Sequence, residues 1–160
     1  MSQVTQRKMS SGIENDRGGL RYREIYDASA TERIRIIRNG VPATGVKRLL
    51  SDLHIDQKSF FAALNLKTAT VNRKAARNES LSFEGGERVI GIVRLIGQLE
   101  AIIEESGNPE GFDAADWLSR WLHNAVPALG NQRPVDLLDT MEGQGLVAQV
   151  LAQTQSGAYA

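Results

Sequence analysis

The sequence predicts an all-α protein in which a long central helix connects an N-terminal helical cluster to a smaller C-terminal helical unit. Apolar residues recur at the 3.6-residue spacing of amphipathic helices from Ser29 onward. No segment shows the sustained alternation of apolar and polar residues that indicates a half-buried strand. Residues that favour helix ends, such as Ser29 before the first periodic segment and Gly40 after it, divide the chain into short stretches.

The composition limits the kind of protein. The chain has 160 residues, of which 41% are hydrophobic and 24% charged, so it can form one domain or two small ones. It has no cysteine, which excludes disulfides, thiolate zinc sites and a cysteine nucleophile. It shows neither the apolar segment of a signal peptide nor the roughly 20 apolar residues of a membrane span. We therefore expect a cytoplasmic protein without membrane contact.

The formal net charge is zero, but the charges are unevenly distributed along the chain. Residues 1–80 hold 15 basic and 8 acidic residues, a net charge of +7, whereas residues 81–160 hold 4 and 11, a net charge of −7. This asymmetry indicates a basic half that meets nucleic acid and an acidic half with another role. Chance segregation of solvated faces would give the same count.

The first half of the chain predicts a tail followed by short helices. Residues 1–28 contain few apolar anchors and several glycines, which is typical of a flexible tail, with Leu20, Tyr22 and Tyr26 as candidates for docking on the folded part. Residues 29–82 predict a compact cluster of short helices with short connections. The residues expected to cap these helices are Ser29, Thr44, Asp56 and Thr68.

Residues 83–105 predict the longest helix, and a Gly/Pro/Asn-rich linker follows it to residue 111. The nine Val, Ile and Leu residues of this helix cover more than one face. Such a helix is buried on several sides, either between the two halves of the chain or in a homodimer. Gly91 and Gly97 would allow another backbone to approach closely, although each costs about 1 kcal/mol relative to alanine. We assign residues 83–111 to a connecting or dimerisation helix with its linker.

Residues 112–160 predict a small helical unit. Asp113 is expected to cap its first helix, and Phe112 is expected to pack on Trp117 as a hydrophobic staple. Trp117 and Trp121 lie on one apolar stripe of this helix, where both could also fill the unit's own core.

A corner of proline and glycine follows this helix. Pro127 and Gly130 turn the chain, and Pro134 is well placed at the first position of the next helix. Thr140 is expected to cap the last helix, and Gly157 is expected to end it.

Residues 57–73 have the spacing of a helix-turn-helix. This motif needs apolar residues at its fourth, eighth, tenth and fifteenth positions. Counted from Gln57, these positions hold Phe60, Leu64, Leu66 and Val71. The turn position, where left-handed backbone favours glycine, holds Asn65, the next most tolerant residue. Phe61 occupies a position that usually holds alanine, so the angle between the two helices stays open.

The second helix of such a motif enters the major groove of DNA with its N-terminal residues toward the base edges. The candidate DNA-binding residues on its outer face are Lys67, Thr68, Thr70, Asn72, Arg73, Lys74 and Arg77. Asn72 and Arg73 suit base edges, whereas the other basic residues suit phosphates. A plain helical hairpin with a solvated basic face would show the same residues.

Several short segments, most of them in the last third of the chain, are similar to one known family. They are Leu81-Ser82, Glu87-Arg88-Val89, Trp121-Leu122, Pro127-Ala128-Leu129-Gly130-Asn131, Pro134-Val135-Asp136-Leu137-Leu138-Asp139-Thr140, Gly143 or Gly145, Val147, Leu151 and Gly157-Ala158-Tyr159-Ala160. Over about residues 30–160 the chain resembles the Xre/MbcA/ParS antitoxins, which join an Xre-like helix-turn-helix to a C-terminal toxin-binding domain. Arg133 departs from the family pattern, which usually has a helix-capping threonine there.

The resemblance implies an Xre-like DNA-binding domain at residues 29–82 and a toxin-binding domain at residues 112–160. It also implies direct neutralisation of a cognate toxin, usually a RES-domain protein that consumes NAD⁺ or ADP-ribosylates a target, and autoregulation through operator DNA as a homodimer. We hypothesise that the C-terminal half covers the active site of the toxin. The candidate toxin-binding residues are Trp121, Asn124, Leu129, Arg133, Gly157, Tyr159 and Ala160.

Two rival interpretations are a stand-alone helix-turn-helix transcriptional regulator, whose C-terminal half only dimerises or binds a small ligand, and an enzyme. The paired carboxylates Glu104-Glu105 lie at adjacent positions of a helix end, and the pair Asp113 and Asp116 is explained by capping. No glycine-rich phosphate loop follows a strand. We therefore expect no catalytic residue, no metal site and no cofactor.

Overall fold

A computed structural model describes residues 21–155 of the chain. Its helices are α2 (Tyr22–Asp27), α3 (Ala30–Asn39), α4 (Ala43–Leu53), α5 (Gln57–Ala63), α6 (Thr68–Ala76), α7 (Phe83–Glu105), α8 (Ala114–Leu122) and α9 (Met141–Gln155), with the 3₁₀ turns η1 (Pro127–Leu129) and η2 (Pro134–Leu137). Within residues 21–155 the only β pairing consists of two isolated bridges. The predicted all-α fold is confirmed.

Most of the helix starts follow from local hydrogen bonds that the sequence indicated. Ser29 forms a full capping box with Glu32 at the start of α3. The carboxylates of Asp56 and Asp113 accept backbone N–H groups at the starts of α5 and α8, and the hydroxyl of Thr140 does so at the start of α9. These four capping predictions are confirmed.

Thr44 and Thr68 do not cap helices, contrary to our prediction. Helix α4 begins two residues earlier than expected, at Ala43, whose N–H donates to the carbonyl of Glu79 at 3.1 Å. A carbonyl from the chain after α6 therefore accepts a hydrogen bond from an N–H group at the start of α4. The side-chain hydroxyl of a capping residue is not needed for that group. Helix α6 includes Thr68 as its first residue and has no side-chain cap.

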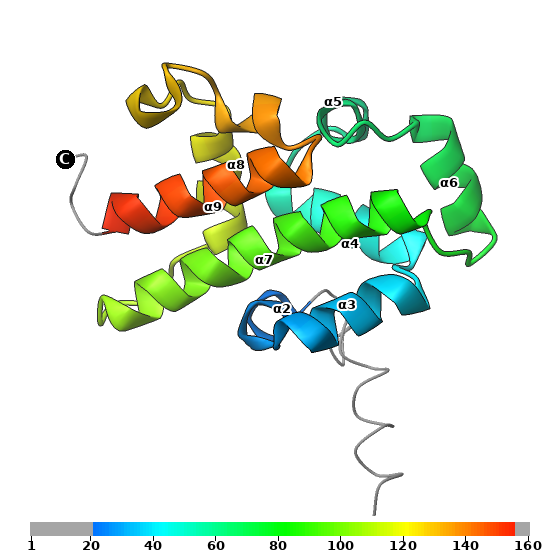
Figure 1. Cartoon of the computed structure of the whole chain (residues 1–160), viewed down its shortest axis with the longest axis horizontal. Helices are drawn as coiled ribbons and strands as arrows, with labels where there is room; N and C mark the ends of the chain where they lie inside the picture. The colour runs from blue at the N-terminus through cyan, green and yellow to red at the C-terminus, as the bar shows by residue number, and fades with distance from the viewer. Residues whose placement is uncertain (1–20, 156–160) are drawn as a thin grey trace, which may run out of the picture.

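Helix α7 is the centre of the molecule. Helices α2 and α3 pack against it from one side and α8 and α9 from another (Figure 1). Its aliphatic side chains between Val89 and Leu99 are almost completely buried. Of the two alternatives for burying this helix, between the two halves of the chain or in a homodimer, the structure shows the first. Among the large apolar side chains of α7, all of whose residues are described, only Phe83 at the first position is exposed, at 53%. A homodimer through residues 83–111 stays a prediction.

Two glycines of α7 allow the neighbouring helices to approach its backbone. A Cβ atom at Gly97 would overlap the backbone carbonyl of Tyr22 in α2. A Cβ atom at Gly91 would overlap the side-chain amide of Gln144 in α9. Glycine is therefore required at position 97 by space rather than by backbone angle, whereas a side chain at position 91 would displace the end of the Gln144 side chain.

Residues 22–27, which we assigned to a flexible tail, form helix α2 instead. Ile25 is 1% exposed in the core, and the Tyr22 hydroxyl donates a hydrogen bond to Asp52 of α4. The guanidinium of Arg33 donates to the last carbonyls of α2, at 3.2 Å for Ile25 and 3.1 Å for Tyr26. The tail prediction is corrected for this segment; residues 1–20 lie outside the described part. No helix within residues 21–155 is long and apolar enough to cross a membrane.

The Gly97→Ala substitution tests the contact between α2 and α7. Because the new methyl group meets a backbone carbonyl, α2 must shift, and we expect a loss of about 2 kcal/mol in the free energy of unfolding. The matched control is Gly145→Ala in α9, where no atom lies within 4 Å of the added carbon. It should gain about 0.5–1 kcal/mol from helix propensity. Urea denaturation measures both, and a Gly97→Ala protein as stable as the unmodified chain would contradict the contact.

Candidate functional site

Helices α5 and α6 form the helix-turn-helix that the spacing predicts. Phe60, Leu64 and Val71 are buried between them, and Leu66 is partly buried against the same core. Asn65 has a φ of 54°, so it adopts the left-handed conformation expected of the turn position. The Leu66 N–H donates to the carbonyl of Phe61 at 2.7 Å, which closes the turn.

Phe61, the departure from the usual small residue, is fully buried. Its ring meets that of Phe60 edge-to-face, with the centroids 6.1 Å apart and the planes at 61°. The larger side chain is therefore accommodated in the core, where the edge-to-face contact with Phe60 is a favourable arrangement.

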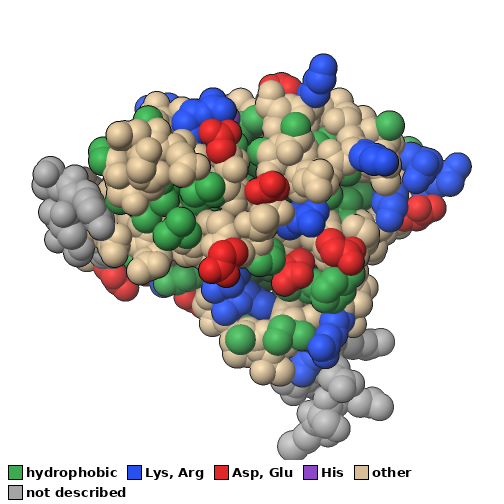
Figure 2. Space-filling view, turned by 45° about the horizontal axis from the view of Figure 1, so that its top comes forward, with side chains coloured by type: hydrophobic (Ala, Val, Ile, Leu, Met, Phe, Trp, Pro, Cys, Tyr) green, Lys and Arg blue, Asp and Glu red, His purple; other side chains and the backbone are tan. Residues whose placement is uncertain are grey.

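Helix α6 lies at one end of the molecule, on the right in Figure 1, and Figure 2 shows basic side chains gathered at that end. Of the candidate DNA-binding residues, Lys67, Arg73 and Arg77 are exposed, and Thr68, Thr70, Asn72 and Lys74 are partly buried. The Lys74 ammonium donates to the carbonyl of Ser80 at 3.2 Å. The Asn72 amide oxygen is buried without a hydrogen-bond partner. The three exposed cations are thus the groups that solvent or a ligand reaches most readily.

The chain between α8 and α9, residues 123–140, forms the proline–glycine corner, and its first part is a closed loop. The N–H of Val126 donates to the carbonyl of Gln132, and the N–H of Asn131 donates to the carbonyl of Val126, both at 3.0 Å. Gly130 and Asn131 have left-handed φ values of 66° and 64°. Leu129 of this loop is 5% exposed. The corner is therefore a well-defined surface.

Three aromatic side chains form a row along α8 and the residue before its cap. Phe112 packs on Trp117 with ring centroids 6.5 Å apart, as the staple predicts, and Trp117 stacks on Trp121 at 6.2 Å and 15°. All three are partly buried at the edge of the core. Trp121 thus belongs to a stacked row and keeps part of its surface accessible.

The other candidate toxin-binding residues differ in accessibility. Asn124 and Arg133 are exposed on the corner, whereas the buried Leu129 is not available as the contact residue we expected. Gly157, Tyr159 and Ala160 lie outside the described residues. The Arg133 guanidinium makes two hydrogen bonds to the Asp136 carboxylate, at 3.1 and 3.0 Å, which raise the pKa of Arg133 above its ordinary value. This pair orients the guanidinium on the surface.

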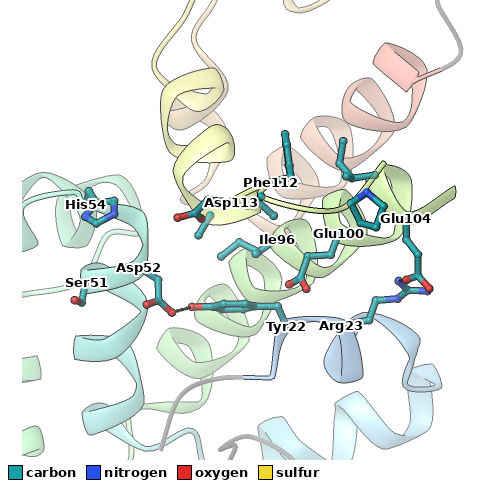
Figure 3. A pocket seen from close by; sticks show the side chains of 15 residues that line it. Tyr22, Arg23, Ser51, Asp52, His54, Ile96, Glu100, Glu104, Phe112 and Asp113 are labelled. Carbon is teal, nitrogen blue, oxygen red and sulfur yellow. Dashed lines mark hydrogen bonds and ion pairs between the residues drawn. The ribbon is translucent and has the colours of Figure 1, made fainter. Parts of the chain in front are cut away.

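A cleft of about 880 Å³ opens between α2, the C-terminal end of α4, α7 and the linker before α8. Figure 3 shows Tyr22, Glu100 and Asp113 around it, with Tyr22 bonded to Asp52. Burial and the bond to Asp52 raise the pKa of the Tyr22 phenol. Burial also raises the pKa of the Glu100 carboxyl, which makes no hydrogen bond or ion pair with the described residues.

A second, smaller cleft of about 400 Å³ lies between the helix-turn-helix and the corner. Ser59, Ala62 and Ala63 of α5 form one wall, and Arg133 and Asp136 form the other. The two candidate functional units therefore meet directly. Among the described residues no group of three or more His, Asp or Glu side chains is placed to hold a metal ion.

Two glutamines on buried helix faces escaped the sequence analysis. Gln144 is 4% exposed and donates from its amide nitrogen to the carbonyls of Arg88 and Leu138, at 3.0 and 2.9 Å. Gln98 of α7 donates to the carbonyl of Ala148 at 2.9 Å. Gln144 lies on the same face of α9 as the apolar residues of that helix. Its position in the helical repeat was therefore the feature of the sequence that could have predicted its burial.

The raised pKa of Glu100 gives a pH-dependent prediction. A carboxyl whose pKa is higher in the folded state stabilises the fold only while it is protonated, so its ionisation lowers stability as the pH rises. We expect Glu100→Gln to raise the free energy of unfolding at pH 7 and to lose this advantage below its ordinary pKa of 4.5. Thermal unfolding between pH 4 and pH 8 measures the difference. Glu110→Gln, at an exposed linker position, is the control, and equal curves for both variants would refute the prediction.

Comparison with known proteins agrees with this architecture. A family model described as the antitoxin Xre-like helix-turn-helix domain matches residues 32–94, and the model of the antitoxin Xre/MbcA/ParS C-terminal toxin-binding domain matches residues 107–157. A protein of Sphingobium sp. (strain YBL2) named "Prs ADP-ribosylating antitoxin" is 58% identical over 139 residues, which are 87% of each chain. With a helix-turn-helix, a compact C-terminal unit and a relative of this similarity, the chain belongs to the Xre/MbcA/ParS family of antitoxins.

Proposed function

We propose that this antitoxin neutralises a RES-domain toxin that consumes NAD⁺ or ADP-ribosylates a target, by covering the active site of that toxin with its C-terminal corner. The observation that carries the proposal is the corner, which presents Asn124 and the oriented guanidinium of Arg133 and directly follows the helix in which Trp121 stacks on Trp117. Trp and Arg are the residue types that most often dominate binding energy. The name of the Sphingobium relative, "Prs ADP-ribosylating antitoxin", supports a partner toxin that ADP-ribosylates its target.

The helix-turn-helix supplies the second activity in this proposal. Helix α6 enters the major groove of operator DNA, where Arg73 reads a base edge and Lys67 and Arg77 contact phosphates. Two copies of the chain bind two half-sites, as helix-turn-helix proteins do. The protein then represses its own operon, which places it in the cytoplasm with the chromosome.

The protein acts by binding in this account, without catalysis and without a cofactor. The rival interpretation, a regulator whose C-terminal half only dimerises, does not explain the match to a toxin-binding domain. Gly157, Tyr159 and Ala160, outside the described residues, stay in the proposal as candidate toxin contacts. Leu129 is left out because it is buried.

The toxin contact is tested by Arg133→Ala and Trp121→Ala. Each removes a side chain of the hot-spot type, and we expect each to weaken toxin binding about 30-fold or more, which corresponds to about 2 kcal/mol. Titration calorimetry with the purified protein encoded next to this chain's gene measures the affinity. Arg38→Ala is the matched control, because it removes an exposed arginine of α3, which packs on another side of α7. Unchanged binding by both corner variants would exclude the corner as the contact surface.

The DNA contact is tested by Arg73→Ala and Lys67→Ala. Loss of a base-reading arginine should cost about 1–3 kcal/mol on the operator and reduce discrimination against altered sequences. Loss of a phosphate-contacting lysine should weaken binding to all sequences and lower the salt dependence of log K by about one. Fluorescence anisotropy with the duplex upstream of this chain's gene measures both. Arg133→Ala should bind DNA normally, and a loss as large as that of Arg73→Ala would contradict the assignment.

A further inference from the structure

The C-terminal end of α3 is held against the segment that leads from α6 to α7, at the right of Figure 1. The N–H of Leu81 donates to the carbonyl of Val41 at 2.9 Å, and Pro42 forms an isolated antiparallel bridge with Ser80 beside it. Gly40, the residue after α3, lies so close that a Cβ atom there would be 2.7 Å from the Ser80 hydroxyl oxygen. The end of α3 and the segment after the helix-turn-helix therefore keep one relative position.

An exposed arginine lies at the end of each of these two helices. Arg38 is in the last turn of α3, and its side chain makes no hydrogen bond or ion pair with the described residues. Arg77 directly follows α6 and is a phosphate contact in the proposed function. Through the contact of Gly40 with Ser80, chain length limits the Cα atoms of the two arginines to a separation of about 24 Å. One turn of B-DNA rises about 34 Å, so both side chains are within reach of a single duplex.

The surroundings of Arg38 are not uniformly cationic. Glu79 is exposed on the segment beside α3, and Glu84 is exposed in the first turn of α7. These carboxylates oppose a general attraction of DNA to this end of α3. A guanidinium that donates directly to a phosphate oxygen still gains a charge-assisted hydrogen bond. The other role open to Arg38 is to interact with the negative end of the α3 dipole.

We propose that Arg38 extends the DNA contact beyond the helix-turn-helix, by binding a phosphate of the operator that flanks those contacted from α6. This inference rests on the proposed function and adds to it a contact from a helix outside the motif. Phosphate contacts fix the position of a protein on the duplex without reading its sequence. Because α3 is already fixed to the segment after α6, little backbone ordering opposes this contact.

The salt dependence of DNA binding tests the contact in the full chain. We expect Arg38→Gln to lower the slope of log K against log salt concentration by about one, which corresponds to about 5-fold weaker binding at about 0.15 M salt. The loss should be equal on the duplex upstream of this chain's gene and on a duplex of unrelated sequence, because a phosphate contact carries no sequence information. Arg38→Lys keeps the charge and should keep the slope. Fluorescence anisotropy measures all four values.

Arg120→Gln is the matched control, because it also removes one exposed arginine, from α8 in the C-terminal unit. Its slope should equal that of the unmodified chain, and a decrease as large as that of Arg38→Gln would reflect net charge and overturn the inference. Urea denaturation separates the contact from the dipole role. Arg38→Gln with lowered stability and an unchanged salt slope shows that the arginine serves only the helix end, which also overturns the inference.

Phosphate ethylation interference locates the contact on the upstream duplex. We expect at least one interfering phosphate at the edge of the binding site with the unmodified chain and Arg38→Lys, and its absence with Arg38→Gln. Identical patterns for all three proteins overturn the inference. If Arg73→Ala weakens binding and Arg38→Gln does not, the inference fails and the proposed DNA contact of α6 stands. If the unmodified chain does not bind the duplex, the proposed DNA contact fails and the inference fails with it.

Discussion

The burial of α7 on several sides is the constraint on which the rest of the structure depends. A helix covered by aliphatic residues beyond a single face cannot be stable in water until other helices cover it. Two glycines allow the neighbouring helices to pack closely on α7. The backbone of α2 lies against Gly97, and the side-chain amide of Gln144 lies against Gly91. The N-terminal helices and the C-terminal unit thus share one core. The sequence predicts two modules, but both of them fold around the single helix α7.

This shared core explains how two polar surfaces with different roles are held in fixed positions. Helix α6 lies at one end of the molecule (Figure 1), and its cations Arg73 and Arg77, with Lys67 just before it, are exposed. The corner is closed by its own backbone hydrogen bonds and rests against α5. The large cleft between α2, α4 and α7 is lined by four carboxylates, those of Asp52, Glu100, Glu104 and Asp113, and by the guanidinium of Arg23.

Local features made much of this fold predictable. The periodicity gave the bounds of α7, and capping chemistry at Ser29, Asp56 and Asp113 gave three helix starts. Features that depend on distant contacts were missed. Helix α2 has one buried side chain and is stabilised by contact with Gly97, far along the chain. The backbone of Glu79 replaced the predicted cap of α4, and Leu129 is buried rather than projecting from the corner. The predictions were correct where residues close in sequence determine the structure, and wrong where tertiary packing determines it.

The central claim, that both functional units depend on one core around α7, is tested most directly by urea unfolding followed with two probes. Both tryptophans of the chain lie in α8, so their fluorescence reports the C-terminal unit. Far-UV circular dichroism reports all helices, most of which lie outside that unit. A shared core predicts coincident transitions with the same midpoint and the same dependence on urea. Loss of the tryptophan signal at a urea concentration that leaves most of the helical signal intact would contradict it.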